Sequence, residues 1–261
     1  HRNSRLLTSW TESVEHQELF LSQGCFCVSE EIAQYVRSID YPGQCRVVPN
    51  GVDTGQFKPD SQIKREIRAR LSIPDSSTVI GYVGSFKQWH NLPLTVDVIK
   101  HLRDQGFDVC LLLIGSGLEK DATLDYCRLQ GVLETVVSLD SIAHDDIHNY
   151  LGAMDIALMT YNTSQSFYFS PLKMFEYMAM GIPIVSTGIG QIADILGNND
   201  AGILIDDPDI STFSQAIENL IREPELLAHY AKQSRDLAVN EYSWIHNAQR
   251  IVDLCSAVRQ P

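Results

Sequence analysis

The sequence contains no apolar run that approaches the ~18 residues of a membrane-spanning helix, and no signal peptide. It has no CxxC pair, no internal repeat and no low-complexity tract. Positive charge is scarce, because 20 Lys and Arg residues stand against 33 Asp and Glu residues and leave a net charge of −13. These features argue against a membrane span and against general binding of nucleic acid or anionic membranes. They do not exclude an anionic ligand, which a few local positive groups can bind.

Cysteine is present, but not in the spacing of a metal or redox motif. Cys25 and Cys27 alternate on an expected strand, so both side chains point the same way, into a core. We favour buried thiols over metal or redox roles, a pattern that fits a reducing compartment. We therefore expect a cytoplasmic protein, and leave open whether the full-length protein binds the inner face of a membrane. The cysteines are Cys25, Cys27, Cys45, Cys110, Cys127 and Cys255.

From about residue 79, short apolar strands alternate with helical stretches. This alternation predicts a parallel sheet with helices on both faces, a doubly wound Rossmann-like α/β fold. Ligands of such sheets bind beyond the carboxyl ends of the strands. The expected strands are Val79–Val83, Val109–Ile114, Thr135–Leu139, Asp155–Met159, Pro183–Ser186 and Gly202–Ile205. The expected helices are 92–105, 119–130, 145–152, 171–180 and 190–196, followed without a further strand by 209–222, 224–240 and 243–258.

Residues 1–45 have a different organisation. A polar helix (Ser9–Leu21), a strand (Gly24–Val28) and a helix opened by Ser29 make too few elements to close a core. The chain begins at His1 without a methionine, and we expect it to be a piece of a longer protein. We place one domain boundary near residue 45 and a second near residue 240, before a final helix over 241–261.

The segment that starts at Ser170 predicts an anion-binding helix start. Ser170 suits the N-cap and Pro171 the first helical position. The free N–H groups of that turn and the helix dipole favour an anion, and Lys173 adds positive charge. Glu176, three residues on, shares the face of Lys173 and offers a carboxylate to hydroxyl groups. Together these groups describe a sugar or ribose phosphate ligand, whereas a plain surface Lys–Glu pair is the alternative.

Two glycine loops follow expected strands. Gly84 permits close backbone approach, Ser85 can bond a phosphate, and Lys87 or His90 can neutralise it. Gly115 lies in a second such loop, at the end of the most apolar strand. Each loop is also compatible with an ordinary tight turn.

Two other patterns have a competing explanation. Gly188–Ala193 fits G-x-G-x-x-A, a dinucleotide fingerprint that would imply NAD, with Asp206 as its acidic residue. It follows the fifth expected strand rather than the first, and Gly197 interrupts the next helix, so we do not favour it. Asp207-Pro208-Asp209 resembles a metal-binding Asp-x-Asp, but a turn and a helix cap explain it better, and no metal is expected.

Taken together, these segments resemble the family 4 glycosyltransferases of the GT-B fold, specifically their C-terminal, donor-binding domain. Tyr242-Ser243-Trp244 resembles the start of the final helix, which in this fold returns to the N-terminal domain. The resemblance spans nearly the whole chain. The segments that carry it, in order, are Val47–Asp53, Gly84–Asn91, Phe175–Val185 and Gly188–Asp207.

The resemblance implies a retaining, metal-independent transfer of sugar from a nucleotide diphosphate donor, UDP rather than GDP. The acceptor (a glycan, a lipid or a small molecule) is not identified. Glu176 would hold the donor ribose, Ser141 and Ile142 would lie by the base, and the backbone from Ser170 to Leu172 would face the diphosphate and sugar. The expected catalytic residues are Lys173, Glu176 and His90. The expected donor-binding residues are Gly84, Ser85, Lys87, Gly115, Ser141, Ile142, Tyr168, Ser170, Pro171 and Leu172.

Three positions depart from the family pattern. Ser85 stands where an arginine is usual, His90 where a lysine is usual, and Tyr168 where the first of two glutamates is usual. We expect Lys173, Lys87 and a protonated His90, with the helix dipole, to stabilise the leaving diphosphate. Because Tyr168 replaces the first glutamate, the contact with the donor sugar must differ from the family pattern.

The resemblance also gives the expected domains a role. Residues 1–45 would be a remnant of the N-terminal, acceptor-binding domain, 46–240 the donor-binding domain and 241–261 the crossover helix. Because the acceptor domain is nearly absent, we expect this chain alone to bind nucleotide and to be weakly active or inactive. A nucleotide-sugar epimerase of the same fold and a non-catalytic nucleotide-binding module remain alternatives.

Overall fold

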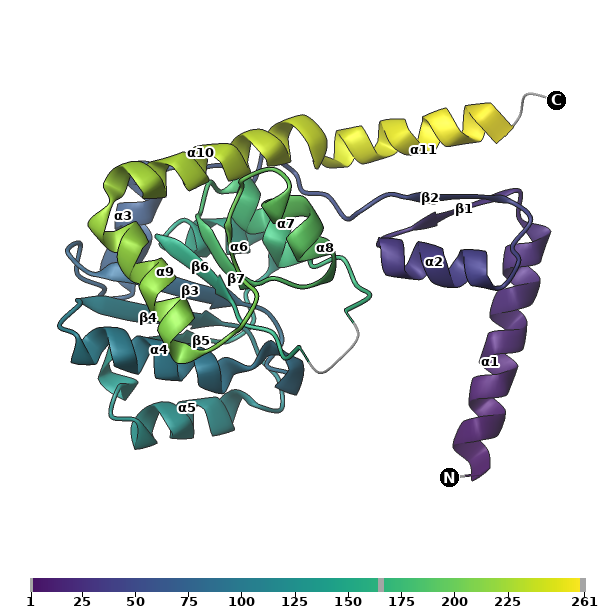
Figure 1. Cartoon of the computed structure of the whole chain (residues 1–261). Coiled ribbons are helices and arrows are strands. Elements are labelled where there is room, and N and C mark those ends of the chain that lie inside the picture. Colours follow the sequence, from purple (N-terminus) through teal and green to yellow (C-terminus); the bar gives the residue numbers. More distant parts are fainter. Residues whose placement is uncertain (1, 164–166, 259–261) are drawn as a thin grey trace.

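The computed structural model describes residues 2–163 and 167–258, and its larger part is a six-stranded parallel sheet between two layers of helices (Figure 1). The strand order is β5-β4-β3-β6-β7-β8, and every neighbouring pair is parallel. The predicted doubly wound α/β fold is therefore confirmed. The strands are β3 (Thr78–Val83), β4 (Val109–Ile114), β5 (Val136–Leu139), β6 (Ile156–Met159), β7 (Ile184–Thr187) and β8 (Ile203–Ile205).

The sheet buries both of its faces because successive strand residues point to opposite sides. In β4, Leu112 packs into one core cluster, whereas Leu111 and Leu113 pack into the other. The first cluster includes residues of α3 (Ser61–Arg70), α6 (His144–Leu151), α7 (Leu172–Ala179) and α10 (Pro224–Glu241). The second includes residues of α4 (Leu92–Asp104) and α9 (Ile210–Arg222), and α5 (Lys120–Leu129) lies beside α4.

The helix α3 was not predicted. Asp60 caps it by accepting hydrogen bonds from the N–H groups of Gln62 (2.8 Å) and Ile63 (3.1 Å). Its buried Arg68 forms an ion pair with Asp155 at the start of β6. The cap and the four-residue spacing of Ile63 and Ile67 were the available signals.

The predicted helix 190–196 is irregular. The structure has a short helix α8 (Gly190–Ile192) followed by a π-helical turn (Ala193–Gly197). A long helix after β7, as a dinucleotide fingerprint requires, is absent from this described segment. The cap explanation for Asp209 is confirmed, because its carboxylate accepts from the N–H of Thr212, whose hydroxyl accepts from the Asp209 N–H.

The N-terminal region forms a separate two-stranded parallel sheet, β1 (Gly24–Cys27) and β2 (Gln44–Val47), with α1 (Arg2–Leu21) and α2 (Glu30–Ser38). The strand β2 was not predicted, and it crosses the boundary expected near residue 45; both domain boundaries stay predictions. Figure 1 shows α11 (Trp244–Val258) continuing from α10 toward this small sheet, and α11 contacts β1. Among the described residues, no helix combines the length and apolarity that crossing a bilayer needs.

Candidate functional site

A cleft lies beyond the carboxyl ends of β3 and β4, where the two predicted glycine loops meet. Gly84 and Gly115 have φ of 143° and 136°, a region that favours glycine. A Cβ on Gly115 would lie 2.0 Å from the carbonyl oxygen of Gly84. Glycine at position 115 is thus required for the two loops to touch.

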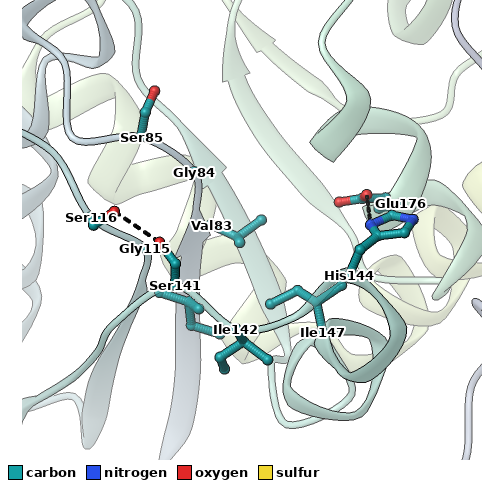
Figure 2. A pocket seen from close by; sticks show the side chains of 11 residues that line it. Val83, Gly84, Ser85, Gly115, Ser116, Ser141, Ile142, His144, Ile147 and Glu176 are labelled. Atoms are coloured by element: carbon teal, nitrogen blue, oxygen red, sulfur yellow. Dashed lines mark hydrogen bonds and ion pairs between the residues drawn. The ribbon is translucent and has the colours of Figure 1, made fainter.

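One half of the cleft, here called the β5 hollow, has a volume of about 290 Å³ and opens between these loops, the residues after β5 and α6 (Figure 2). Its floor is apolar, and the hydroxyls of Ser116 and Ser141 hydrogen-bond each other at 2.8 Å on its rim. It contains six of the predicted site residues. The lining residues are Val83, Gly84, Ser85, Ile114, Gly115, Ser116, Ser141, Ile142, His144, Ile147 and Glu176.

The other half, here called the α7 hollow, has a volume of about 420 Å³ and lies against the start of α7. It shares Val83, Gly84, Ser85 and Glu176 with the β5 hollow, so the two form one continuous cleft with Glu176 at the junction. Its remaining lining residues are Trp89, His90, Tyr161, Phe169, Pro171, Leu172 and Lys173.

The ammonium group of Lys173 is surrounded by rings and glycine rather than by carboxylates. It lies 4.2 Å from the ring centre of Tyr82 and 5.7 Å from that of Tyr161. A Cβ on Gly84 would come within 3.1 Å of Nζ. Burial lowers the pKa of Lys173 to about 7, although the charge of Glu176 opposes this shift. Among the described residues Lys173 has no ion pair, so its charge is available to an anion in the cleft.

His90 is buried beneath the α7 hollow among aromatic rings, those of Tyr82, Trp89 and Tyr161. Its Nδ1 lies 3.5 Å from Nζ of Lys173. Burial, and then the charge of Lys173, lower the pKa of His90 to about 3. The expectation of a protonated His90 is therefore wrong for the protein by itself, and the imidazole is neutral at physiological pH.

Glu176 is the carboxylate of the cleft. Only 12% of its side chain is exposed, and burial raises its pKa, while His144 and Lys173 act in the opposite direction. Its Oε1 lies 3.8 Å from Nδ1 of His144, as Figure 2 shows. One residue on, Tyr177 accepts a hydrogen bond from the N–H of Val83 at 2.7 Å, which ties α7 to the end of β3.

The predicted capping role of Ser170 is wrong. Helix α7 begins at Leu172, and Pro171 occupies the cap position without a side-chain hydrogen bond. The hydroxyl of Ser170 is used elsewhere, because it accepts from the N–H of Asn50 (2.9 Å) and donates to Oε1 of Gln191 (2.6 Å). Ser170 therefore joins three distant segments under the cleft.

Two further predicted side chains lie outside both hollows. Lys87 lies near the ring of Trp89, 5.8 Å from its centre. Tyr168 is 58% exposed, and its carbonyl oxygen accepts a hydrogen bond from Ser29 at 2.6 Å. The sequence did not indicate four further lining residues, which are His144, Trp89, Tyr161 and Phe169. Trp89 lies in the segment Gly84–Asn91 that was already singled out, and His144 begins α6, two residues after the predicted Ile142. The fold alone brings the other two to the cleft.

Curated proteins similar in sequence are glycosyltransferases. The chain is 27% identical over 234 residues to the D-inositol 3-phosphate glycosyltransferase of Rhodococcus jostii (strain RHA1), covering 86% of this chain and 50% of that protein. It is 22% identical over 216 residues to the GDP-mannose-dependent alpha-(1-6)-phosphatidylinositol monomannoside mannosyltransferase of Mycolicibacterium smegmatis, covering 82% of this chain and 56% of that protein. The chain thus spans about half the length of the relatives it matches.

Solved structures show the same fold. Anabaena HepE in complex with UDP superimposes with a TM-score of 0.77 at 20% identity, over 90% of this chain and 64% of that chain. The C-terminal domain of a group 1 glycosyl transferase (LpcC) from Francisella tularensis superimposes with a TM-score of 0.64 at 20% identity, over 74% of this chain and 100% of that domain.

A family model described as "Glycosyl transferases group 1" matches residues 77–223, which is more than half of the chain and contains both hollows. Since the match includes the loops of Gly84 and Gly115 together with α7, the chain belongs to the group 1 glycosyltransferases and represents the C-terminal domain of the GT-B fold.

Proposed function

We propose that the cleft binds a nucleotide diphosphate sugar and that the whole protein transfers the sugar to an acceptor. The observation that carries this proposal is the position of Glu176, which joins the β5 hollow to the α7 hollow beside Lys173. A base fits the β5 hollow, near Ser141 and Ile142, and the ribose hydroxyls then reach the Glu176 carboxylate. UDP is the favoured nucleotide, since HepE was solved with UDP, while the mannosyltransferase relative is named for GDP-mannose.

The diphosphate belongs at the start of α7. The N–H of Met174 bonds to the carbonyl of Pro171 at 3.0 Å, and the N–H groups of Leu172 and Lys173 point out of the helix start without a backbone acceptor among the described residues. These two amides, the Lys173 ammonium and the Ser85 hydroxyl give the diphosphate several donors. A bound anion restores the full charge of Lys173, because it opposes the effect of burial on the Lys173 pKa.

The sugar then lies in the α7 hollow, against Trp89 and Phe169. As the bond from the sugar to the diphosphate breaks, negative charge grows on the leaving group, and Lys173 and the helix amides stabilise it. We propose that these groups do so without a metal and that the transfer is retaining. Neutral His90 holds the Lys173 ammonium in place and is not an acid.

The acceptor site is proposed to lie in the part of the protein that this chain does not span. Accordingly, we propose that the 261-residue chain binds the donor and transfers little sugar. Acceptor turnover by the purified chain at the rate of the full-length protein would contradict this proposal.

Isothermal titration of the chain with UDP, GDP, ADP and NAD, with and without EDTA, tests the nucleotide assignment. We expect a nucleoside diphosphate to bind without metal, UDP most tightly, and the Glu176→Gln variant to bind it more weakly. Binding of NAD alone would overturn the proposal. Isomerisation of a UDP-sugar by the full-length protein without an acceptor would indicate an epimerase instead.

A further inference from the structure

Three of the six cysteines meet in the small N-terminal sheet, outside the cleft. Cys25 and Cys27 lie two residues apart on β1 and share a face, and Cys45 is the parallel partner of Cys25 on β2. The three Sγ atoms all lie within 4.8 Å of one another, and those of Cys27 and Cys45 are 3.6 Å apart. The sequence could not indicate this cluster, because β2 was not expected and no CxxC spacing is present.

The cluster lies in a small apolar core. Cys27 is 3% exposed, and Ala33 and Val36 of α2 pack in the same core, while Cys25 and Cys45 are half-buried and reachable from solvent. The remaining cysteines are elsewhere, with Cys110 and Cys127 in separate cores of the large sheet and Cys255 exposed on α11. All six are free thiols, so nothing covalent holds the three together.

The sulfur triangle has the size of a metal site. An ion that lies about 2.3 Å from each of three sulfurs holds those sulfurs about 4 Å apart, whether trigonal or tetrahedral. The observed separations, from 3.6 Å to at most 4.8 Å, bracket this value. Small side-chain adjustments therefore suffice to bring the three sulfurs onto one ion.

We propose that Cys25, Cys27 and Cys45 bind one thiophilic d¹⁰ cation, Zn²⁺ or Cu⁺, through their three sulfurs. Soft thiolate ligands select such ions over hard cations. Each cysteine gives up one proton on binding, and the three thiolates outweigh the charge of the cation. Arg37, which is ion-paired with Glu30, lowers the pKa of Cys25 through its charge and so opposes the effect of burial there.

Cation binding has to displace the protons of the free thiols. Burial raises the pKa of Cys27 to about 12 and also raises that of Cys25, so both are protonated at neutral pH without a cation. The site therefore differs from an activated, redox-reactive cysteine, which needs a low pKa. A bound ion would link β1 to β2, which pair over only four residues, and would stabilise this small sheet.

Titration of the reduced, metal-free 261-residue chain with Cd²⁺ tests the proposal, because Cd²⁺ bound by thiolates gives an ultraviolet charge-transfer band. We expect saturation at one ion per chain. With the ion bound, three fewer thiols should react with a thiol reagent. Zn²⁺ should displace Cd²⁺ from the same site. Cys45→Ser should weaken Cd²⁺ binding at least about 100-fold, since loss of a ligand costs more than loss of an outer partner. The matched control, Cys255→Ser, should bind as the parent does.

Cys25→Ser is the second variant, because half-buried Cys25 and Cys45 tolerate serine better than Cys27 does. Both variants should keep the far-ultraviolet circular dichroism of the parent and still bind UDP, since neither Cys25 nor Cys45 lines either hollow of the cleft. The proposal is overturned by equal Cd²⁺ affinity in Cys45→Ser and Cys255→Ser, or by the absence of a stoichiometric band in the parent. Recovery of a Cys27–Cys45 disulfide together with no Cd²⁺ binding after its reduction overturns it as well.

Discussion

The two hollows of the cleft share one wall and differ in everything else. The β5 hollow is lined by small hydroxyl side chains and aliphatic residues, and within it only His144 and Glu176 carry titratable groups. The α7 hollow has aromatic walls and holds a half-buried lysine above a buried histidine. A neutral planar base suits the first and an anion with a sugar suits the second. We therefore expect the β5 hollow to determine the affinity for the nucleoside and the α7 hollow to determine the affinity for the diphosphate and sugar. Substitutions in each hollow can test the two affinities independently.

The largest effect is expected at Lys173. Lys173→Ala removes the cation of the α7 hollow, so UDP affinity should fall about 10–100-fold, the equivalent of one or two charge-assisted hydrogen bonds. Uridine, which lacks the diphosphate, should bind the variant with the same affinity as it binds the parent protein. Calorimetric titration with both ligands measures the difference. Lys87→Ala, which removes a lysine outside both hollows, is the control and should change little. Equal losses for uridine and UDP would remove Lys173 from the diphosphate.

The pH dependence of UDP binding should come from the same residue. The pKa of Lys173 is lowered to about 7 in the free protein, so the ammonium is present below pH 7 and lost above it. UDP binds the ammonium form, and its affinity should therefore fall as pH rises above 7, by up to about tenfold per pH unit. His90, with a pKa of about 3, stays neutral throughout and adds no second step. Titrations from pH 7 to 9, above the second ionisation of the UDP phosphate at about pH 6, measure the profile, which should be much flatter for Lys173→Met.

Glu176, at the boundary between the two hollows, should affect the affinity for the ribose of the nucleotide. Glu176→Ala removes the carboxylate proposed for the ribose, and UDP affinity should fall about tenfold, since hydrogen bonds to a charged group are worth about 1.5–3 kcal/mol. The 2′-deoxy analogue should lose less, because it lacks one of the hydroxyls. Competition titrations with both nucleotides give the two ratios. A similar loss for both would place the carboxylate away from that hydroxyl.

The strand-end loops of the cleft were easier to predict than the aromatic walls of the α7 hollow. Gly84, Gly115 and Ser141 lie where parallel strands end, and a strand end shows in the sequence as an apolar run followed by glycine or a polar turn. The α7 hollow depends on contacts between distant segments. Tyr161 and Phe169 line it through the chain's path after β6, which no local pattern encodes.

The errors have the same origin. Ser170 has the residue type of a cap, but Asn50, 120 residues away, occupies its hydroxyl. His90 has a residue type that titrates near neutral pH, but the rings around it and the neighbouring ammonium keep it neutral. Local sequence supplied the right elements and residues, whereas their partners, and therefore their protonation and hydrogen bonds, required the tertiary structure.

The smallest effect is expected at Trp89, which should distinguish the sugar from the nucleotide. Trp89 lines the α7 hollow and is 38% exposed, so Trp89→Ala should weaken a UDP-sugar about 2–10-fold through lost ring contact, while UDP alone should bind nearly as before. Trp244→Ala removes an exposed tryptophan on α11, away from the cleft, and is the matched control. Displacement titrations with UDP and UDP-glucose give both affinities. A loss shared equally by UDP and UDP-glucose would place the ring against the nucleotide, and the α7 hollow would then no longer be the place of the sugar.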